Sequence, residues 1–156
     1  MFLLFSAISM RGQEGKINDI LNSNRPRKFS ADFIQIKQSA LLEKELVSTG
    51  RITLEKSGQI HIETITPEQK VTDYNSDDTG KNYGFRLPSE KDFDITLLEG
   101  DGYILKMIPK RGNLRQIISQ IIVHTDSQTQ IANKLMILFR NGDLIQLEFS
   151  DIKVTI

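Results

Sequence analysis

The sequence predicts a single, mainly β domain: a meandering antiparallel sheet preceded by one short helix. Three observations lead to this prediction. Apolar residues recur at every second position through much of the chain after Phe29, and two is the side-chain period of a strand. Turn-forming residues separate these stretches at short intervals. A chain of 156 residues that is 38% hydrophobic can bury one sizeable core but is too short for two ordinary domains.

The helix is expected first and the strands follow it. Ile17, Ile20 and Leu21 fall on one side at helical spacing, which predicts a short amphipathic helix over residues 16–21. Period-two alternation then predicts eight strands. They are expected at residues 29–38, 47–56, 60–63, 93–98, 103–108, 117–125, 131–139 and 144–154.

Three connecting segments carry weaker signals. The stretch 40–45 favours a helix and is expected to join the first two strands. Residues 68–90 are polar and rich in turn formers, which predicts an exposed loop flanked by weak strands. Residues 114–121 fit both a helix and a strand, so a helical turn entering a strand is expected there.

Two hairpin turns have clear local signals. Ser57-Gly58 separates two alternating stretches. Asn141-Gly142 can supply both positive φ angles of a type I′ turn. In the hairpin at Asn141-Gly142, three residues of the first strand are expected to share a face with three of the second. These sets are Leu135, Ile137 and Phe139, and Ile145, Leu147 and Phe149.

Several predicted strands are apolar on both faces. Tyr103, Leu105 and Met107 lie on one side of a strand, with Ile104 and Ile108 on the other. Such a sheet must have both faces covered, or one face must line a ligand cavity. Periodicity alone leaves both interpretations open, and plain structural burial is the commoner one.

Composition excludes several classes of function. Lys and Arg total 20 and Asp and Glu total 20, a formal net charge of +0, so no broad field attracts nucleic acid or an anionic bilayer. The absence of cysteine excludes disulfides, thiolate zinc sites and cysteine nucleophiles. No phosphate-binding, dinucleotide-binding or hydrolase motif is present. No cofactor is therefore expected.

The first nine residues form a short apolar run that ends in small residues, and the chain turns polar abruptly after it. The run is too short to span a bilayer as a helix. It resembles the end of a signal peptide, although the basic segment that normally precedes such a run is missing. An ordinary buried N-terminal segment is the alternative. We expect residues 1–12 to be a signal-peptide remnant and 13–156 to form the domain.

Candidate catalytic and metal-binding residues are few. His61 and His124 lie inside predicted strands with no second ligand at a useful spacing, so no metal site is expected. Asp92 and Asp94 can share a strand face as a carboxylate pair, but nothing in the sequence supplies their partner. A small hydrolase that uses one of them remains an alternative. The inventory as a whole points away from an enzyme.

Three stretches together resemble the periplasmic outer-membrane lipoprotein carrier family, the LolA-like proteins. Phe29–Gln35 is similar to the family's opening strand with its Phe-x-Gln core. Ser48-Thr49-Gly50-Arg51 is similar to its Ser-x-Gly-Arg strand, and the next strand, which runs to Pro67, is similar to the family strand that ends in Thr-x-Pro. The third stretch begins at Gly102–Lys110 and runs through Asn141-Gly142 to Phe149–Ile152. The order and spacing of the stretches carry the resemblance.

The resemblance implies an unclosed antiparallel β-barrel whose apolar concave face is capped by short helices and shields acyl chains. Ile60 and Ile62 match cavity-facing aromatic positions of the family, and Lys56 matches an arginine that holds the lid closed. The implied cavity or lipid-binding residues are Phe33, Ile52, Leu54, Ile60, Ile62, Leu105, Ile137, Leu147 and Phe149.

The expected function is that of a periplasmic, non-enzymatic carrier of lipoproteins or another lipid toward the outer membrane. Its partners would be the acyl chains, an inner-membrane donor protein and an outer-membrane acceptor protein, with the carrier itself a monomer. The alternative is an envelope sensor or scaffold that binds a protein partner through the same half-barrel.

Overall fold

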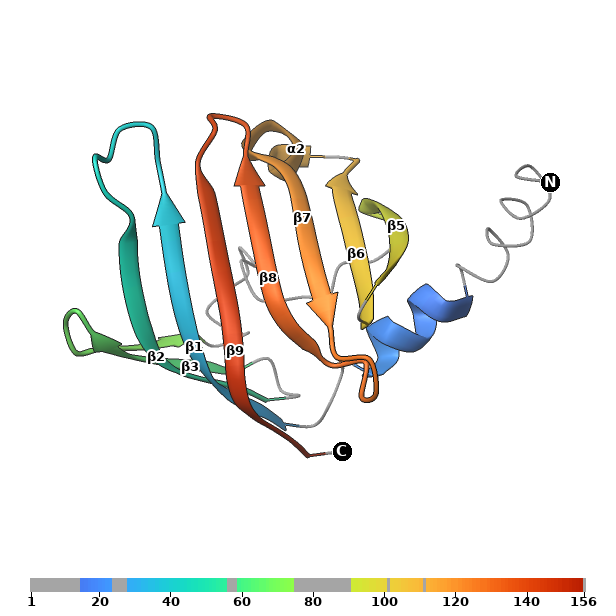
Figure 1. Ribbon diagram of the computed structural model, residues 1–156, viewed down its shortest axis with the longest axis horizontal. Coiled ribbons are helices and arrows are strands. Elements are labelled where there is room, and N and C mark those ends of the chain that lie inside the picture. The colour runs from blue at the N-terminus through green and yellow to red at the C-terminus, as the bar shows by residue number, and fades with distance from the viewer. Residues whose placement is uncertain are drawn as a thin grey trace.

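The computed structural model describes residues 15–23, 28–55, 59–74, 91–100, 102–110 and 112–155. Within these ranges nine strands form one sheet, and every neighbouring pair is antiparallel (Figure 1). The strands are β1 (Lys28–Gln38), β2 (Leu46–Glu55), β3 (Ile60–Thr66), β4 (Lys70–Tyr74), β5 (Phe93–Gly100), β6 (Gly102–Pro109), β7 (Ile118–Thr125), β8 (Ala132–Phe139) and β9 (Leu144–Thr155).

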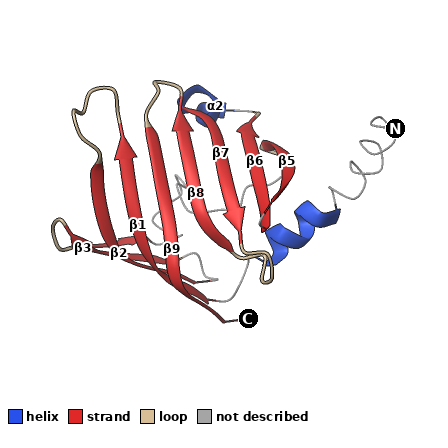
Figure 2. Cartoon of the chain, viewed as in Figure 1, coloured by secondary structure: helices blue, strands red, loops and turns tan. Residues whose placement is uncertain are grey.

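The strand order is β4-β3-β2-β1-β9-β8-β7-β6-β5, so the first and last strands pair at the centre and two meanders run outward from them. Among the described residues, β4 and β5 are the two edges and do not pair with each other, which leaves the barrel unclosed. Figure 2 shows both ends of the sheet bending out of the plane of the central strands. The predicted half-barrel is therefore confirmed.

Irregularities in the ladder coincide with this curvature. The pairing of β2 with β3 shifts between Thr49 and Gly50, and the pairing of β1 with β9 shifts beside Asp151, whose φ is 49°. An extra residue in one strand bends that strand and increases its twist. The Ser-x-Gly-Arg stretch therefore marks a bend in the sheet.

Two helices are described. The N-terminal helix covers residues 15–23 and packs on the sheet. Helix α2 (Gly112–Ile117) leads directly into β7, which confirms the predicted helical turn entering a strand. None of the six residues of α2 is buried, so α2 lies at the end of the sheet instead of capping a face. No helix in the described ranges is long and apolar enough to cross a membrane.

Two local predictions are wrong. Residues 40–45 form a turn instead of a helix, because so short a stretch needs tertiary packing to be helical and its Leu41 is 95% exposed. The turn at Asn141-Gly142 is not type I′, since only Gly142 has a positive φ, of 94°. Phe139 N donates to Asp143 O and Gly142 N to Phe139 O, the pattern of a three-residue hairpin loop with a left-handed glycine.

The hairpin itself is confirmed, because Leu135 pairs with Leu147 and Ile137 with Ile145. The segment predicted as an exposed loop begins with β4, in line with a weak flanking strand, and its residues 75–90 lie outside the described ranges. The N-terminal run and the turn at residues 57 and 58 also lie outside them.

Candidate functional site

One face of the sheet, called the inner face here, carries two apolar rows that cross five neighbouring strands. Residues in each row pair directly from strand to strand between β9 and β5, and alternation places every one of them on the same side. One row is Leu147, Leu135, Val123, Leu105 and Leu97, and the next is Ile145, Ile137, Ile121, Met107 and Ile95. All ten side chains are apolar, so this part of the face can contact hydrocarbon but offers no group for proton transfer.

The inner face continues across β1, β2 and β3 as a second apolar cluster. Ala31, Phe33, Ile52 and Ile60 are buried at its centre. The partly buried side chains around them are Phe29, Leu54, Ile62, Leu147, Phe149 and Ile152. The rings of Phe29 and Phe149 meet edge to face with centroids 5.9 Å apart, a favoured aromatic geometry.

All nine residues that the resemblance implied as cavity-lining lie on this one face. Seven belong to the second cluster and Ile137 lies in the partly buried middle of the rows, whereas Leu105 lies in a separate cluster under the N-terminal helix. The proposed lid residue Lys56 lies outside the described ranges. The structure thus brings the nine predicted residues to one face, where Leu105 lies beneath the N-terminal helix and the other eight lie outside the cluster of that helix.

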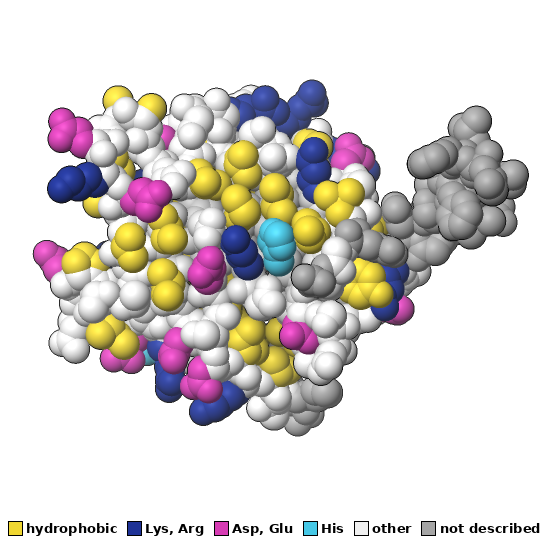
Figure 3. Space-filling model, viewed as in Figure 1, with side chains coloured by type: hydrophobic (Ala, Val, Ile, Leu, Met, Phe, Trp, Pro, Cys, Tyr) yellow, Lys and Arg dark blue, Asp and Glu magenta, His cyan; other side chains and the backbone are white. Residues whose placement is uncertain are grey.

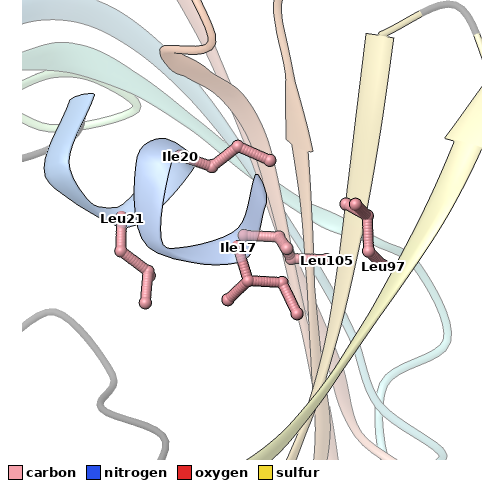
Figure 4. Close-up of a cluster of buried hydrophobic side chains, with 5 residues drawn as sticks. All are labelled: Ile17, Ile20, Leu21, Leu97 and Leu105. Carbon is pink, nitrogen blue, oxygen red and sulfur yellow. The ribbon is translucent and has the colours of Figure 1, made fainter. Parts of the chain in front are cut away.

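The N-terminal helix covers the end of the inner face formed by β5 and β6. Ile17, Ile20 and Leu21 pack on Leu97 and Leu105, as Figure 4 shows. Their spacing is what the sequence predicted, and the burial of these five side chains supplies the driving force for docking.

Two polar contacts fix the position of this helix. Ser23 Oγ donates to Gln130 Oε1 in the β7–β8 loop at 3.3 Å, and Lys16 Nζ lies 4.6 Å from the centre of the Tyr103 ring. The helix is therefore held at both ends as well as along its apolar side.

The close packing of the second cluster depends on Gly50. Its backbone lies opposite Phe33, and a Cβ atom built at this position would lie 2.1 Å from Glu63 O and 2.8 Å from Phe33 Cζ. No side chain fits there, so the glycine lets the Phe33 ring and the β3 backbone approach β2. The resemblance singled out the Ser-x-Gly-Arg motif, and this close approach is the structural reason for its glycine.

The neighbouring Arg51 points to the opposite, outer face. Its Nε donates to Asp32 Oδ1 at 3.0 Å, and one terminal nitrogen lies 3.7 Å from Asp151 Oδ2. The hydrogen bond with Asp32 raises the pKa of Arg51. This network joins β2, β1 and β9 where both ladders shift register, and it explains the arginine that follows Gly50 in structural terms.

The titratable candidates from the sequence also lie on the outer face. His61 Nδ1 forms a short contact with Asp73 on β4, which makes it an interstrand residue as predicted. Burial, followed by the charge of Lys134, lowers the pKa of His124. Figure 3 shows this face, on which hydrophobic side chains are interspersed with charged ones.

Only one of the two carboxylates expected to share a strand face lies in a described strand. Asp92 lies in the turn before β5, and Asp94 Oδ1 lies 3.3 Å from Lys110 Nζ on the exposed surface. Nowhere in the described part of the chain do three side chains capable of binding a metal come together. The geometry of these residues supports ion pairing rather than hydrolysis.

No family model and no curated protein matches the sequence. Solved structures do resemble it. One similar structure is the complex of MucA and MucB from Pseudomonas aeruginosa. The matched chain is 14% identical over 88% of this chain and 55% of its own length, with a TM-score of 0.52. A second structure of MucB with MucA is 16% identical over 90% of this chain and 54% of that one, with a TM-score of 0.55. This chain thus spans little more than half the length of those proteins.

A LolA superfamily protein from Nitrosomonas europaea is also among the similar structures. It is 8% identical over 89% of this chain and 93% of its own, with a TM-score of 0.37. At these identities the MucB structures show a shared fold and do not identify a ligand.

Proposed function

We propose that this protein is a periplasmic carrier that shields the acyl chains of a lipoprotein, or of another lipid, against its inner face during transfer toward the outer membrane. The observation that carries the proposal is the pair of apolar rows that continue across five strands. Each methylene removed from water contributes about 0.8 kcal/mol, so such a surface can compete with a membrane for hydrocarbon.

In this proposal the acyl chain lies along the part of the inner face that the N-terminal helix leaves uncovered. Phe33, Ile52 and Ile60 form the base of the binding surface, since they are almost fully buried in their cluster. The partly buried residues make the direct contact with ligand. These are Leu54, Ile62, Ile137, Leu147 and Phe149. The carrier works as a monomer between an inner-membrane donor protein and an outer-membrane acceptor protein, and it catalyses no reaction.

Displacement of a fluorescent fatty-acid probe from delipidated protein tests this function through Ile62. Ile62 pairs with Ile52 on the inner face and is only partly buried, so ligand can reach it. Ile62→Ala removes contact area and should weaken binding severalfold, whereas Ile62→Glu places an unpaired carboxylate against hydrocarbon and should abolish it.

Ile65→Glu is the matched control, because Ile65 is on the same strand, is 50% exposed and lines the outer-face pocket beside Arg51. This variant should bind the probe like the wild type. Circular dichroism establishes that each variant is folded. A folded wild-type protein that takes up no acyl probe contradicts the carrier function.

A protein-binding scaffold is the second candidate, and the similarity to MucB solved in complex with MucA favours it. In that case the inner face or an open sheet edge receives a protein segment instead of an acyl chain. Mass spectrometry of material that copurifies from native envelope separates the two functions. A stoichiometric lipid supports the carrier, and a stoichiometric protein without lipid supports the scaffold.

A further inference from the structure

Three connections lie along one end of the sheet. Gln38, the last residue of β1, pairs with Leu144, which places the β1–β2 turn next to the β8–β9 turn. Arg140 N in the latter turn donates to Ile117 O at the end of α2 at 2.9 Å. Figure 1 shows both turns and α2 along this end, called the turn end here.

The turn end exposes large apolar side chains. Leu41 at the tip of the β1–β2 turn is 95% exposed, and Leu114 and Ile117 of α2 are 43% and 54% exposed. Helix α2 buries none of its residues, so these two side chains do not hold the helix to the sheet. They lie on two of the three connections, so apolar side chains are exposed on both sides of the β8–β9 turn.

Cations gather beside these side chains although the chain has no net charge. A pocket of about 620 Å³ next to α2 is lined by Lys110, Arg115 and Arg140 together with three uncharged residues. Arg140 Nε donates to Arg115 O, which keeps the two arginines adjacent. Lysine and arginine side chains are seen at this end of the molecule in Figure 3.

These cations are only partly neutralised. Lys110 Nζ lies 3.3 Å from Asp94 Oδ1, whereas neither Arg115 nor Arg140 forms an ion pair with a carboxylate in the described part of the chain. Asp143 in the adjacent turn accepts a hydrogen bond from Asn141 at 3.2 Å.

The β1–β2 turn adds Glu43, Lys44 and Glu45, and Glu45 accepts a hydrogen bond from Gln38. The positive potential is therefore local to the α2 side of the turn end, and the apolar tip projects on the other side.

We infer that the turn end is a membrane-docking surface for an anionic phospholipid bilayer. Leu41, Leu114 and Ile117 enter the headgroup region, and Arg115 and Arg140, with Lys110, lie against lipid phosphates. Exposed aliphatic side chains combined with arginines that pair with no carboxylate in the described ranges match such an interface. Apolar insertion and attraction to lipid phosphates both favour the orientation with the turn end toward the membrane. The inference concerns a surface other than the inner face and goes beyond the carrier function.

Flotation with vesicles tests the inference on the full chain. Wild-type protein should float with vesicles of phosphatidylcholine mixed with phosphatidylglycerol, bind pure phosphatidylcholine more weakly, and lose binding as salt is raised. Each cation removed should weaken binding about fivefold, so the Arg115→Ala/Arg140→Ala double variant should lose about 25-fold. Leu41→Ser should weaken it on the order of tenfold.

Matched controls lie elsewhere on the molecule. Lys28→Ala/Lys153→Ala removes two cations from the opposite end of the sheet, and Val71→Ser removes a 59% exposed apolar side chain from edge strand β4. Both should float like the wild type. Binding of the fatty-acid probe should be unchanged in the turn-end variants, which separates this test from that of the inner face.

Three outcomes overturn the inference. The wild type fails to float, the turn-end variants float as well as the wild type, or the controls lose as much binding as the turn-end variants. Sedimentation of the protein without vesicles tests the alternative that a second copy of the chain binds the turn end. If the wild type self-associates through Leu41 and Arg115 and does not float, the turn end is a contact between protein chains.

Discussion

Replacing Gly50 by alanine tests the close packing between β2 and β3 that shapes the inner face. The added Cβ would lie 2.1 Å from Glu63 O, 2.8 Å from Phe33 Cζ and 2.9 Å from Thr64 Cα. Carbon and oxygen atoms that are not bonded approach to about 3.3 Å, so the β3 backbone must move by roughly 1 Å. Two of the three obstructing atoms are backbone, and the third belongs to a buried ring, so no flexible side chain can relieve the clash.

The expected loss of stability follows from this geometry. Inserting a methyl group into a packed site costs about 1–3 kcal/mol, and the upper end applies here because backbone must shift. For a chain of this size each kcal/mol lowers Tm by about 2–4 °C, so Gly50→Ala should lower Tm by about 6–12 °C. Thermal unfolding followed by circular dichroism measures the change.

Gly100→Ala serves as the control for this substitution. Gly100 ends strand β5, has no positive φ, and has no atom within 4 Å of a built Cβ. The Tm of Gly100→Ala should therefore stay within about 2 °C of the wild-type value. Equal stability of Gly50→Ala and the wild type would refute the packing argument. An equal loss in both variants would refute its specificity.

Two further predictions concern the turn and the pH dependence. Gly142→Val should lower Tm by several degrees, because the φ of 94° at Gly142 is strained for a β-branched residue, and an unchanged Tm contradicts the turn geometry. Burial and Lys134 hold the pKa of His124 below its ordinary value, so the unfolded chain binds more protons than the folded one near pH 6.5. Stability present at higher pH is therefore lost as the pH falls through about 6.5 toward the lower pKa of the folded chain. This loss should be smaller in His124→Gln when Tm is measured across that range, and an identical pH profile refutes the assignment.

Local pattern was sufficient for most of the strands. The alternation of Leu135, Ile137, Ile145 and Leu147 determined both the hairpin and its register, because a slip of one residue would turn every apolar side chain to the other face. The family resemblance singled out the nine predicted wall residues, and the strand pairing of the folded sheet places them on one side. The spacing of Ile17, Ile20 and Leu21 similarly identified a helix and the side on which it packs.

The connections between strands were less predictable, because their residues favour more than one local structure and none of these preferences is strong. Residues 40–45 favour a helix individually, yet the stretch is too short to be helical without packing, and its Leu41 packs on nothing. At Asn141-Gly142 the dipeptide permits two turn types, and the hydrogen bonds between Phe139, Gly142 and Asp143 select one of them.

Only the tertiary structure decided what depends on residues far apart in the chain. The sequence by itself determined an antiparallel, apolar sheet with a helix before it, because those properties follow from side-chain periods of two and 3.6. The unclosed barrel was implied only by the family resemblance. The pairing of β1 with β9, the cover over Leu105 and the meeting of Arg115 with Arg140 have no local signature. Each of these contacts depends on which surfaces of the folded chain pack against each other.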